Sequence, residues 1–208
     1  MTEEEWLRSA HPEHMLAELP STGSARRYRL FAVACCRCVQ SRVCAGPFHT
    51  AVDVAELYAD GVLPISDLVA TLRVTSDGFP DLSRGEFAAV RACVSPTACA
   101  EAAGRTLLAV TGVKRVPGGI RKRTAALLRD IFGNPYRPVA FDPAWRTDTA
   151  VSLARGMYDS RDFGAMPILA DALQDAGCED EQVLNHCRDA TAPHVRGCWV
   201  CDLVLSLG

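Results

Sequence analysis

The sequence predicts an all-α fold, an irregular bundle of about ten short to medium helices. Apolar residues recur every three to four positions over most of the chain, and helix start and stop signals separate these stretches. No window of five or more residues alternates apolar and polar side chains as a half-buried strand does. The 208 residues are 49% hydrophobic and 23% charged, which excludes a disordered chain. The longest apolar run is far shorter than a membrane span.

Boundary signals justify the helices expected in the first third of the chain. Thr2 and Glu5 form a capping box that opens a short first helix, and Pro12 suits the first turn of a second helix that runs to about Leu19. Three further helices are expected at residues 25–43, 51–59 and 66–73. Gly46-Pro47 is expected to lie in the loop before the second of these, and Gly61 to end it.

Similar signals predict the remaining helices. Ser83 with Glu86 forms a second capping box, and Ser95-Pro96 is an N-cap followed by a proline in the first turn. The helices expected from here to the end of the chain are 83–93, 96–110, 120–132, 148–159, 166–176, 181–188 and 195–207. Similar endings of helices 51–59 and 166–176 suggest stacked helix pairs, although no fixed period runs through the chain.

A proline-rich segment suggests how the chain is organised. Residues 133–147 contain Pro135, Pro138 and Pro143, which favour an extended loop. We therefore expect an N-terminal helical bundle at 1–132, a connecting loop at 133–147 and a C-terminal helical unit at 148–208 packed on the bundle. A single domain that includes all three segments is the alternative.

The middle of the chain is strongly basic. Residues 105–147 carry 9 basic and 2 acidic side chains, whereas the whole chain has a net charge of −3. A glycine-rich turn that leads into a helix makes residues 114–129 a candidate anion or nucleic-acid site. The candidate residues are Lys114, Arg115, Arg121, Lys122 and Arg123. A solvated loop is the plainer interpretation, and the P-loop pattern is absent.

The C-terminal region holds a cluster of metal-ligand residue types. Zinc favours nitrogen and sulfur ligands, and a helix over 195–207 would place His194, Cys198 and Cys201 near one face. The candidate ligands are His186, Cys187, His194, Cys198 and Cys201. Buried core thiols are the plainer alternative, and a redox C-x-x-C or a Cys/His nucleophile and base are weaker ones. We expect no cofactor, and zinc is the one that this pattern would allow.

A second group of cysteines lies in the expected helix 25–43 and just after it. Cys35 and Cys38 are spaced i, i+3, and Cys36, Cys44 and His49 are close in sequence. These residues could meet a metal, but the apolar run before them indicates a core helix. The ten cysteines come with an acidic N-terminus and no export signal, so we expect free thiols in a cytoplasmic protein.

The leading functional hypothesis is a non-catalytic helical binding protein. No G-x-S-x-G or H-E-x-x-H pattern occurs. Aromatic and arginine side chains are the usual anchors of interfaces, so Tyr136, Arg137 and Trp145 in the proline-rich loop are candidate contacts. Alternatively, the two aromatic rings clamp the loop onto the helices. We expect a protein partner; a structural zinc domain and an anion binder are the alternative functions.

Several segments together resemble an uncharacterised family of helical proteins abundant in planctomycete-type bacteria. They are residues 4–7 (EEWL), 30–36 (LFAVACC), 126–139 (ALLRDIFGNPYRPV), 142–145 (DPAW), 167–173 (PILADAL), 186–188 (HCR) and 194–199 (HVRGCW). No activity is established for that family, so the resemblance assigns no functional residues. In the family the position of Cys201 is often aliphatic. The resemblance therefore implies that Cys201 is a departure and weakens its place in a four-ligand zinc site.

Overall fold

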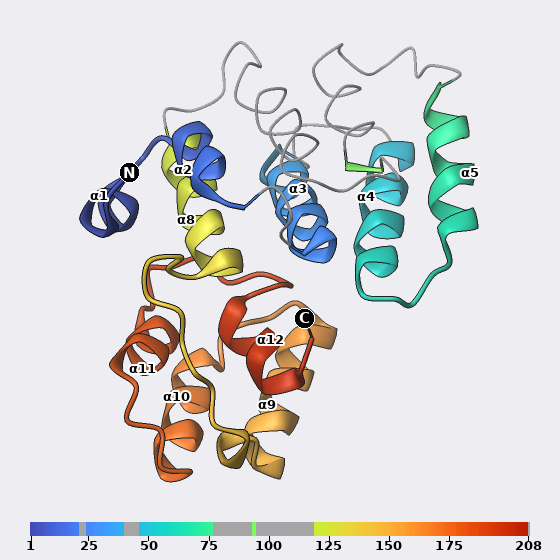
Figure 1. Cartoon of the computed structure of the whole chain (residues 1–208). Helices are drawn as coiled ribbons and strands as arrows, with labels where there is room; N and C mark the ends of the chain where they lie inside the picture. Colours follow the sequence, from blue (N-terminus) through green and yellow to red (C-terminus); the bar gives the residue numbers. More distant parts are fainter. Residues whose placement is uncertain (21–23, 40–45, 77–92, 95–118, 208) are drawn as a thin grey trace. The chain divides into compact units, whose positions relative to one another are not determined.

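The structure is a computed structural model of the chain, and it describes residues 1–20, 24–39, 46–76, 93–94 and 119–207. Within these residues every regular element is helical: ten α-helices and one short 3-10 helix (Figure 1). The all-α prediction is confirmed. The expected helices 83–93 and 96–110 fall almost entirely outside the described residues.

The chain divides into two compact units, Glu3–Leu128 and Arg129–Gly208. The division falls inside helix α8 (Ile120–Phe132), just before the proline-rich segment that we expected to connect two units. That segment belongs to the second unit, because Val139, Phe141 and Trp145 pack against its core. The prolines therefore mark extended chain that lies on a core rather than a free linker.

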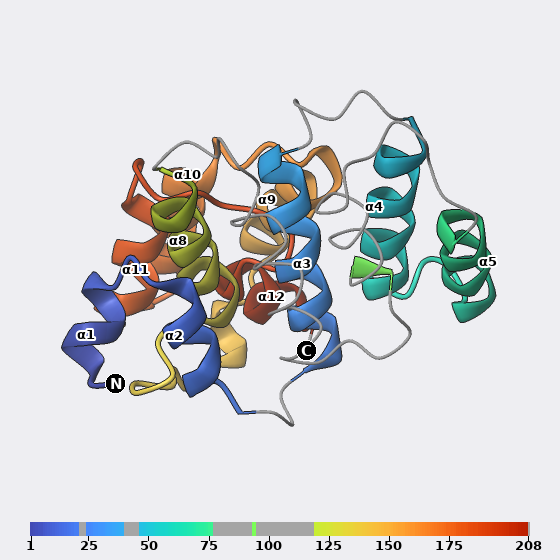
Figure 2. The ribbon, with the colours of Figure 1, turned by 90° about the horizontal axis from the view of Figure 1, so that it is seen from above.

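The first unit contains α1 (Glu3–Arg8), α2 (Pro12–Glu18), α3 (Ala25–Val39), α4 (Gly46–Ala59) and α5 (Ile65–Ser76). Helix α3 packs on α4 and α4 packs on α5, as Figure 2 shows. Helix α4 begins at Gly46 rather than at residue 51, and Pro47 lies in its first turn. A proline is tolerated there because backbone N–H groups in the first turn of a helix have no partner within the helix. Gly61, with φ +71°, follows the end of α4 as expected.

Two charged side chains, Glu56 and Arg29, are buried beside the apolar core of the first unit. Glu56 is 2% exposed and accepts hydrogen bonds from Arg37, which also pairs with Asp53. Arg29 is buried as well and donates to the carbonyl of Cys93 at 2.9 Å. These cations are occupied by partners inside the fold.

The second unit contains the end of α8, then α9 (Asp148–Ser160), α10 (Met166–Asp175), α11 (Glu181–Arg188) and α12 (Trp199–Leu205). Helix α10 packs on α9 and α11, and α12 packs on α9 and α11. Local capping explains two of the boundaries. The side chain of Asp180 accepts hydrogen bonds from two backbone N–H groups at the start of α11, and the side chain of Thr147 caps α9.

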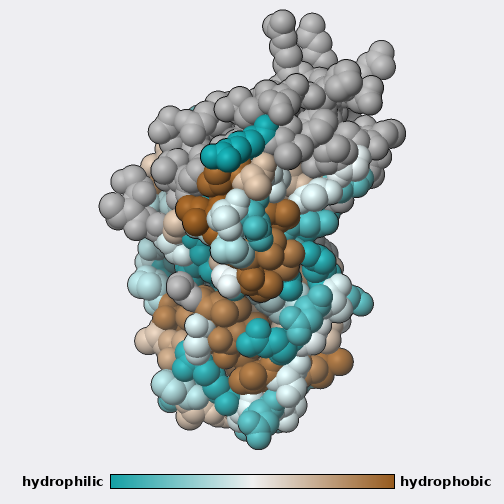
Figure 3. Space-filling view, turned by 90° about the vertical axis from the view of Figure 1, so that its right-hand side faces the viewer, coloured by the Kyte–Doolittle hydropathy of each residue, from teal (hydrophilic) through white to brown (hydrophobic). Residues whose placement is uncertain are grey.

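The surface mixes apolar and polar side chains. On the face that Figure 3 shows, brown apolar areas are interrupted by teal hydrophilic residues. Ile168 on α10 is 58% exposed, and Tyr136 is 40% exposed. No helix in the described part of the chain is both long and apolar enough to cross a membrane.

A candidate metal centre in the second unit

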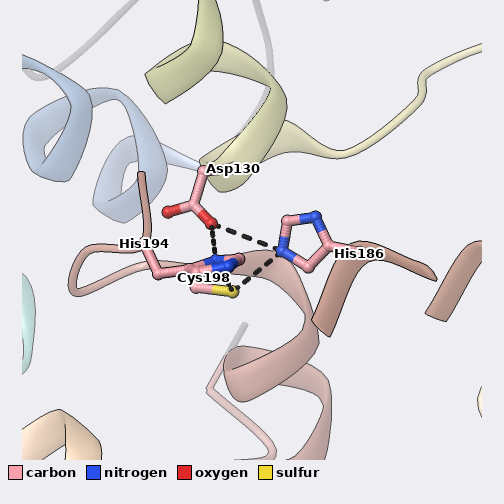
Figure 4. A group of neighbouring side chains, drawn as sticks. All are labelled: Asp130, His186, His194 and Cys198. Atoms are coloured by element: carbon pink, nitrogen blue, oxygen red, sulfur yellow. Dashed lines mark hydrogen bonds and ion pairs between the residues drawn. The ribbon is translucent and has the colours of Figure 1, made fainter. Parts of the chain in front are cut away.

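Four side chains of the second unit converge on one point (Figure 4). Asp130 comes from the last turn of α8, His186 from α11, and His194 and Cys198 from the segment that joins α11 to α12. One ligand atom from each residue lies within 4.8 Å of the others. These atoms are a carboxylate oxygen, two imidazole nitrogens and a sulfur, which are the donor types that zinc accepts.

The distances between these atoms suit a tetrahedral ion. His186 Nε2 lies 3.2 Å from Cys198 Sγ and 3.3 Å from Asp130 Oδ1. His194 Nδ1 lies 2.8 Å from Asp130 Oδ1 and 4.0 Å from Cys198 Sγ. Zinc bonds of about 2.0 to 2.3 Å give a tetrahedron whose edges are roughly 3.3 to 3.8 Å long. The observed separations bracket that range, so small side-chain movements would admit the ion.

The arrangement differs from a catalytic Cys–His–Asp relay. In such a relay one imidazole nitrogen faces the nucleophile and the other faces the carboxylate. Here the same nitrogen of His186, Nε2, faces both Cys198 Sγ and Asp130 Oδ1. Cys198 is also fully buried, and burial, the neighbouring Cys201 thiol and the Asp130 charge raise the pKa of its thiol. His186 therefore does not bridge Cys198 and Asp130 through its two nitrogens, as the imidazole of such a relay does.

Backbone contacts hold Asp130 in the orientation that the centre needs. Its side chain is 1% exposed, and Oδ2 accepts a hydrogen bond from the N–H of Val195 at 2.9 Å. This bond leaves Oδ1 facing the two histidines. It also ties the α11–α12 segment to the end of α8, so the same carboxylate positions the chain that carries His194.

The segment before α12 is not helical, which corrects the expected helix 195–207. Gly197 has φ +92°, and the helix begins only at Trp199, with Cys198 as its N-cap residue. A left-handed glycine interrupts the i, i+4 geometry that the sequence suggested for His194 and Cys198. The two side chains still approach to 4.0 Å, but a turn brings them together rather than a helix face.

Aromatic packing supports one side of the centre. The His186 ring lies 4.9 Å from the His194 ring and 5.2 Å from the Trp199 ring, measured between centroids. Trp199 in turn packs on Gly133, which ends α8 with φ +68°. A Cβ atom at Gly133 would lie 3.3 Å from Cγ of the indole, so the glycine permits this close approach.

The mutual electrostatics of the group favour proton binding in the metal-free protein. Burial lowers the pKa of His186, whereas Cys198 and Asp130 raise it, and the result is about 9. Burial also lowers the pKa of His194, but the hydrogen bond to Asp130 and the contact with Cys198 raise it to about 10. Burial raises the pKa of Asp130, yet its hydrogen bonds with both histidines bring it below the ordinary value.

The structure unites three of the five ligands expected from the sequence and adds one. Cys187 and Cys201 are not in the group, although both are buried in the same core cluster as Cys198. Cys201 Sγ is 3.7 Å from Met166 Sδ. Asp130 was not among the ligands expected from the sequence. A carboxylate in the last turn of a helix is unfavourable next to the negative end of the helix dipole, so its position there could have indicated a nearby cation or metal.

The candidate anion site is only partly described. Lys114 and Arg115 lie outside the described residues. Arg121 pairs with Glu13, Arg123 interacts with the Cys38 thiol, and Lys122 is exposed. Two of the three described cations thus have partners within the first unit, and the structure shows no convergent anion cradle among them.

The three candidate interaction residues have different surroundings. Trp145 packs edge-on against Phe141 and contacts the core of the second unit, as the clamp interpretation expected. Tyr136 is exposed. Arg137 is exposed too, and its carbonyl accepts a hydrogen bond from Gln182 at 3.0 Å.

The N-terminal cysteines do not form a comparable centre in the described part of the chain. Cys35 and Cys36 are fully buried, and burial raises the pKa of the Cys35 thiol. The thiol of Cys36 hydrogen-bonds with that of Cys93, which raises its pKa. Cys44 lies outside the described residues. Cys35 and Cys36 are core residues of α3, as the apolar run before them indicated.

Comparison with protein-family models, with curated proteins and with solved structures finds no match to this chain. The resemblance to planctomycete-type proteins therefore stays a prediction. Inferences about function rest on the geometry of Asp130, His186, His194 and Cys198.

Proposed function

We propose that the second unit is a zinc-stabilised helical domain and that the ion has a structural, non-catalytic role. The convergence of Asp130, His186, His194 and Cys198 carries this proposal. Four protein ligands complete a tetrahedral shell and leave no position for a substrate or a reactive water. The side chains are at most 14% exposed, which also suits a closed site.

The donor set favours zinc over other common metals. Calcium and magnesium take shells of six or more ligands that are mostly or wholly oxygen, and this group offers a single carboxylate. A tetrahedral set of two nitrogens, one sulfur and one oxygen suits zinc, which has no geometric preference from its d electrons.

The position of the ligands indicates what the ion would do for the fold. It would join the end of α8 to α11 and to the start of α12. Helices α11 and α12 have 8 and 7 residues, and helices this short are not stable by themselves. A metal that cross-links short elements supplies stability that the core of a small unit lacks.

The test is metal analysis of the full chain, purified without a chelator, with two matched variants. Cys198 and Cys201 are both 0% exposed, so Cys198→Ala and Cys201→Ala remove the same atom from equally buried positions. We expect about one zinc per chain in the wild type and in Cys201→Ala, and loss of zinc in Cys198→Ala.

Cobalt substitution supplies a second readout. A cobalt ion in the centre should show a thiolate charge-transfer band in the wild type and in Cys201→Ala but not in Cys198→Ala. A wild-type protein without metal, whose thiols all react after unfolding with or without a chelator, would refute the proposal. Equal metal content in the two variants would show that Cys198 is not a ligand.

A further inference from the structure

A tight turn at residues 134–137 directly follows the end of α8. The N–H of Arg137 donates to the carbonyl of Asn134 at 3.2 Å, and the N–H of Tyr136 donates to the side-chain oxygen of Asn134 at 3.0 Å. Asparagine at the first position and Pro135 at the second are residues that such a turn favours. All of its residues after Asn134 are exposed. The turn therefore presents a tyrosine and an arginine at the surface of the second unit.

The start of the turn is held against a residue next to the candidate zinc centre. Gly133 precedes the turn, and a Cβ added to it would lie 3.3 Å from Cγ of the Trp199 indole. Trp199 follows the candidate ligand Cys198 in sequence and is 6% exposed. Its ring lies 5.2 Å from the ring of His186, measured between centroids. The chain that enters the turn thus packs on a side chain that contacts one candidate ligand and adjoins another.

The end of the turn is held by the helix that carries His186. The side-chain amide of Gln182 donates a hydrogen bond to the carbonyl of Arg137 at 3.0 Å. Gln182 and His186 are spaced i, i+4 on α11, so they lie on the same side of that helix, one turn apart. A shift of α11 would therefore move the histidine away from the centre and the amide away from the turn together.

We propose that zinc in the candidate centre fixes the conformation of the 134–137 turn and that loss of the ion releases it. This inference rests on the proposed zinc site. The ion would join α8, α11 and the start of α12, and these are the elements that hold the two ends of the turn. Helix α11 has only 8 residues, so its position depends on its cross-links. Tyr136 and Arg137, the candidate contacts for a partner, are held in one conformation only while zinc is bound.

Chymotrypsin cleavage of the full chain, with zinc and after its removal by a chelator, tests the proposal. The enzyme cleaves after aromatic residues such as tyrosine, and it cuts a folded protein where the chain opens locally. Cleavage after Tyr136 reports on the turn. Cleavage after Tyr158, which is 2% exposed in α9, reports on unfolding of the core. We expect removal of zinc to accelerate cleavage after Tyr136 by a larger factor than cleavage after Tyr158.

The variant Gln182→Ala tests the link through α11 in the zinc-loaded protein. Its zinc content should equal that of the wild type, because Gln182 is not a ligand. Loss of one exposed hydrogen bond should make cleavage after Tyr136 roughly 2- to 5-fold faster. Asn185→Ala changes an exposed residue of the same helix and is the control, which should match the wild type. Equal cleavage of the two variants would overturn the link.

The cleavage rates of the wild type separate this inference from the zinc site itself. A wild type that binds zinc but is cleaved after Tyr136 equally fast with and without the ion would overturn the inference while the zinc site stands. Acceleration by the same factor after Tyr136 and Tyr158 would overturn it too, because the turn would then only follow unfolding of the core. A wild type that binds no zinc would refute both proposals.

Discussion

Asp130→Asn removes one charge from the centre and almost no volume. The side chain is 1% exposed, and Oδ1 faces His194 Nδ1 at 2.8 Å and His186 Nε2 at 3.3 Å. Asparagine still accepts the hydrogen bond from the N–H of Val195 through its own oxygen. Its amide group then faces the two histidines, where a carboxylate stood.

The expected cost of this substitution has two parts. In the metal-free protein it breaks a buried charge cluster, and removal of one partner from such a cluster costs about 3 to 5 kcal/mol. Zinc at a thousandfold excess over its Kd would stabilise the wild type by about 4 kcal/mol. Loss of a ligand should weaken zinc binding at least about 100-fold, which removes about 2.7 kcal/mol of that stabilisation.

Hydrogen exchange of the full chain, followed by mass spectrometry with and without zinc, measures the two units separately. Peptides from residues 129–207 should lose protection in Asp130→Asn, and zinc should restore little of it. Asp180→Asn is the matched control, because the Asp180 side chain caps α11 and asparagine caps a helix as well as aspartate does. If Asp130→Asn exchanges like Asp180→Asn and gains as much protection from zinc, Asp130 is neither a ligand nor the anion of a buried cluster.

Two further predictions concern the surroundings of the centre. In the folded, metal-free protein the pKa values of His186 and His194 are about 9 and 10, above the ordinary value of 6.5. Protonation of these two histidines should therefore stabilise the metal-free fold fully below about pH 6.5, and this stabilisation should be lost as pH rises through 9 to 10. Because zinc displaces these protons, the affinity of the protein for zinc should fall as pH is lowered from about 8.5 to about 6. Chelator competition measures this affinity, and a pH-independent Kd would contradict the assignment of the two histidines as ligands. Gly133→Ala should destabilise the second unit by about 1 to 3 kcal/mol in urea unfolding, since Gly133 has φ +68° and its new Cβ would meet Trp199. Gly156→Ala on α9 is the control, because nothing lies within 4 Å of its new Cβ, and this substitution should be neutral or slightly stabilising. If the two substitutions change stability equally, strain at Gly133 does not explain the loss.

The sequence was sufficient for the fold class and for most helix positions because those depend on local signals. Caps, prolines and glycines act within a few residues, and α8, α10 and α11 lie within one or two residues of the expected ranges. The errors occurred where two local signals compete. Pro47 was expected in a loop before α4, but it lies in the first turn of that helix. Before α12 the apolar pattern predicted a helix from residue 195, but Gly197 has φ +92° and the helix begins after it.

The candidate centre was predictable only in part, because two kinds of proximity build it. His186, His194 and Cys198 are near one another in sequence, so their residue types alone suggested a site. Asp130 is 64 residues from His194, and only the tertiary fold brings the two together. Cys201 shows the opposite error, since it is three positions from Cys198 but its side chain points into the core beside Met166.

The proposed zinc form and the metal-free protein would differ in how the buried charges of this group are compensated. Asp130 and Cys198 raise the pKa values of both histidines, and the histidines lower that of Asp130, so protons compensate the carboxylate in the metal-free protein. With zinc, two neutral imidazoles, a carboxylate and a thiolate would surround a divalent cation, and the net charge would be zero. Buried charges are costly unless they are paired or coordinate a metal, so zinc would compensate the carboxylate and the thiolate together. One protonated histidine is enough to pair with Asp130, whereas a zinc ion would use all four side chains as ligands.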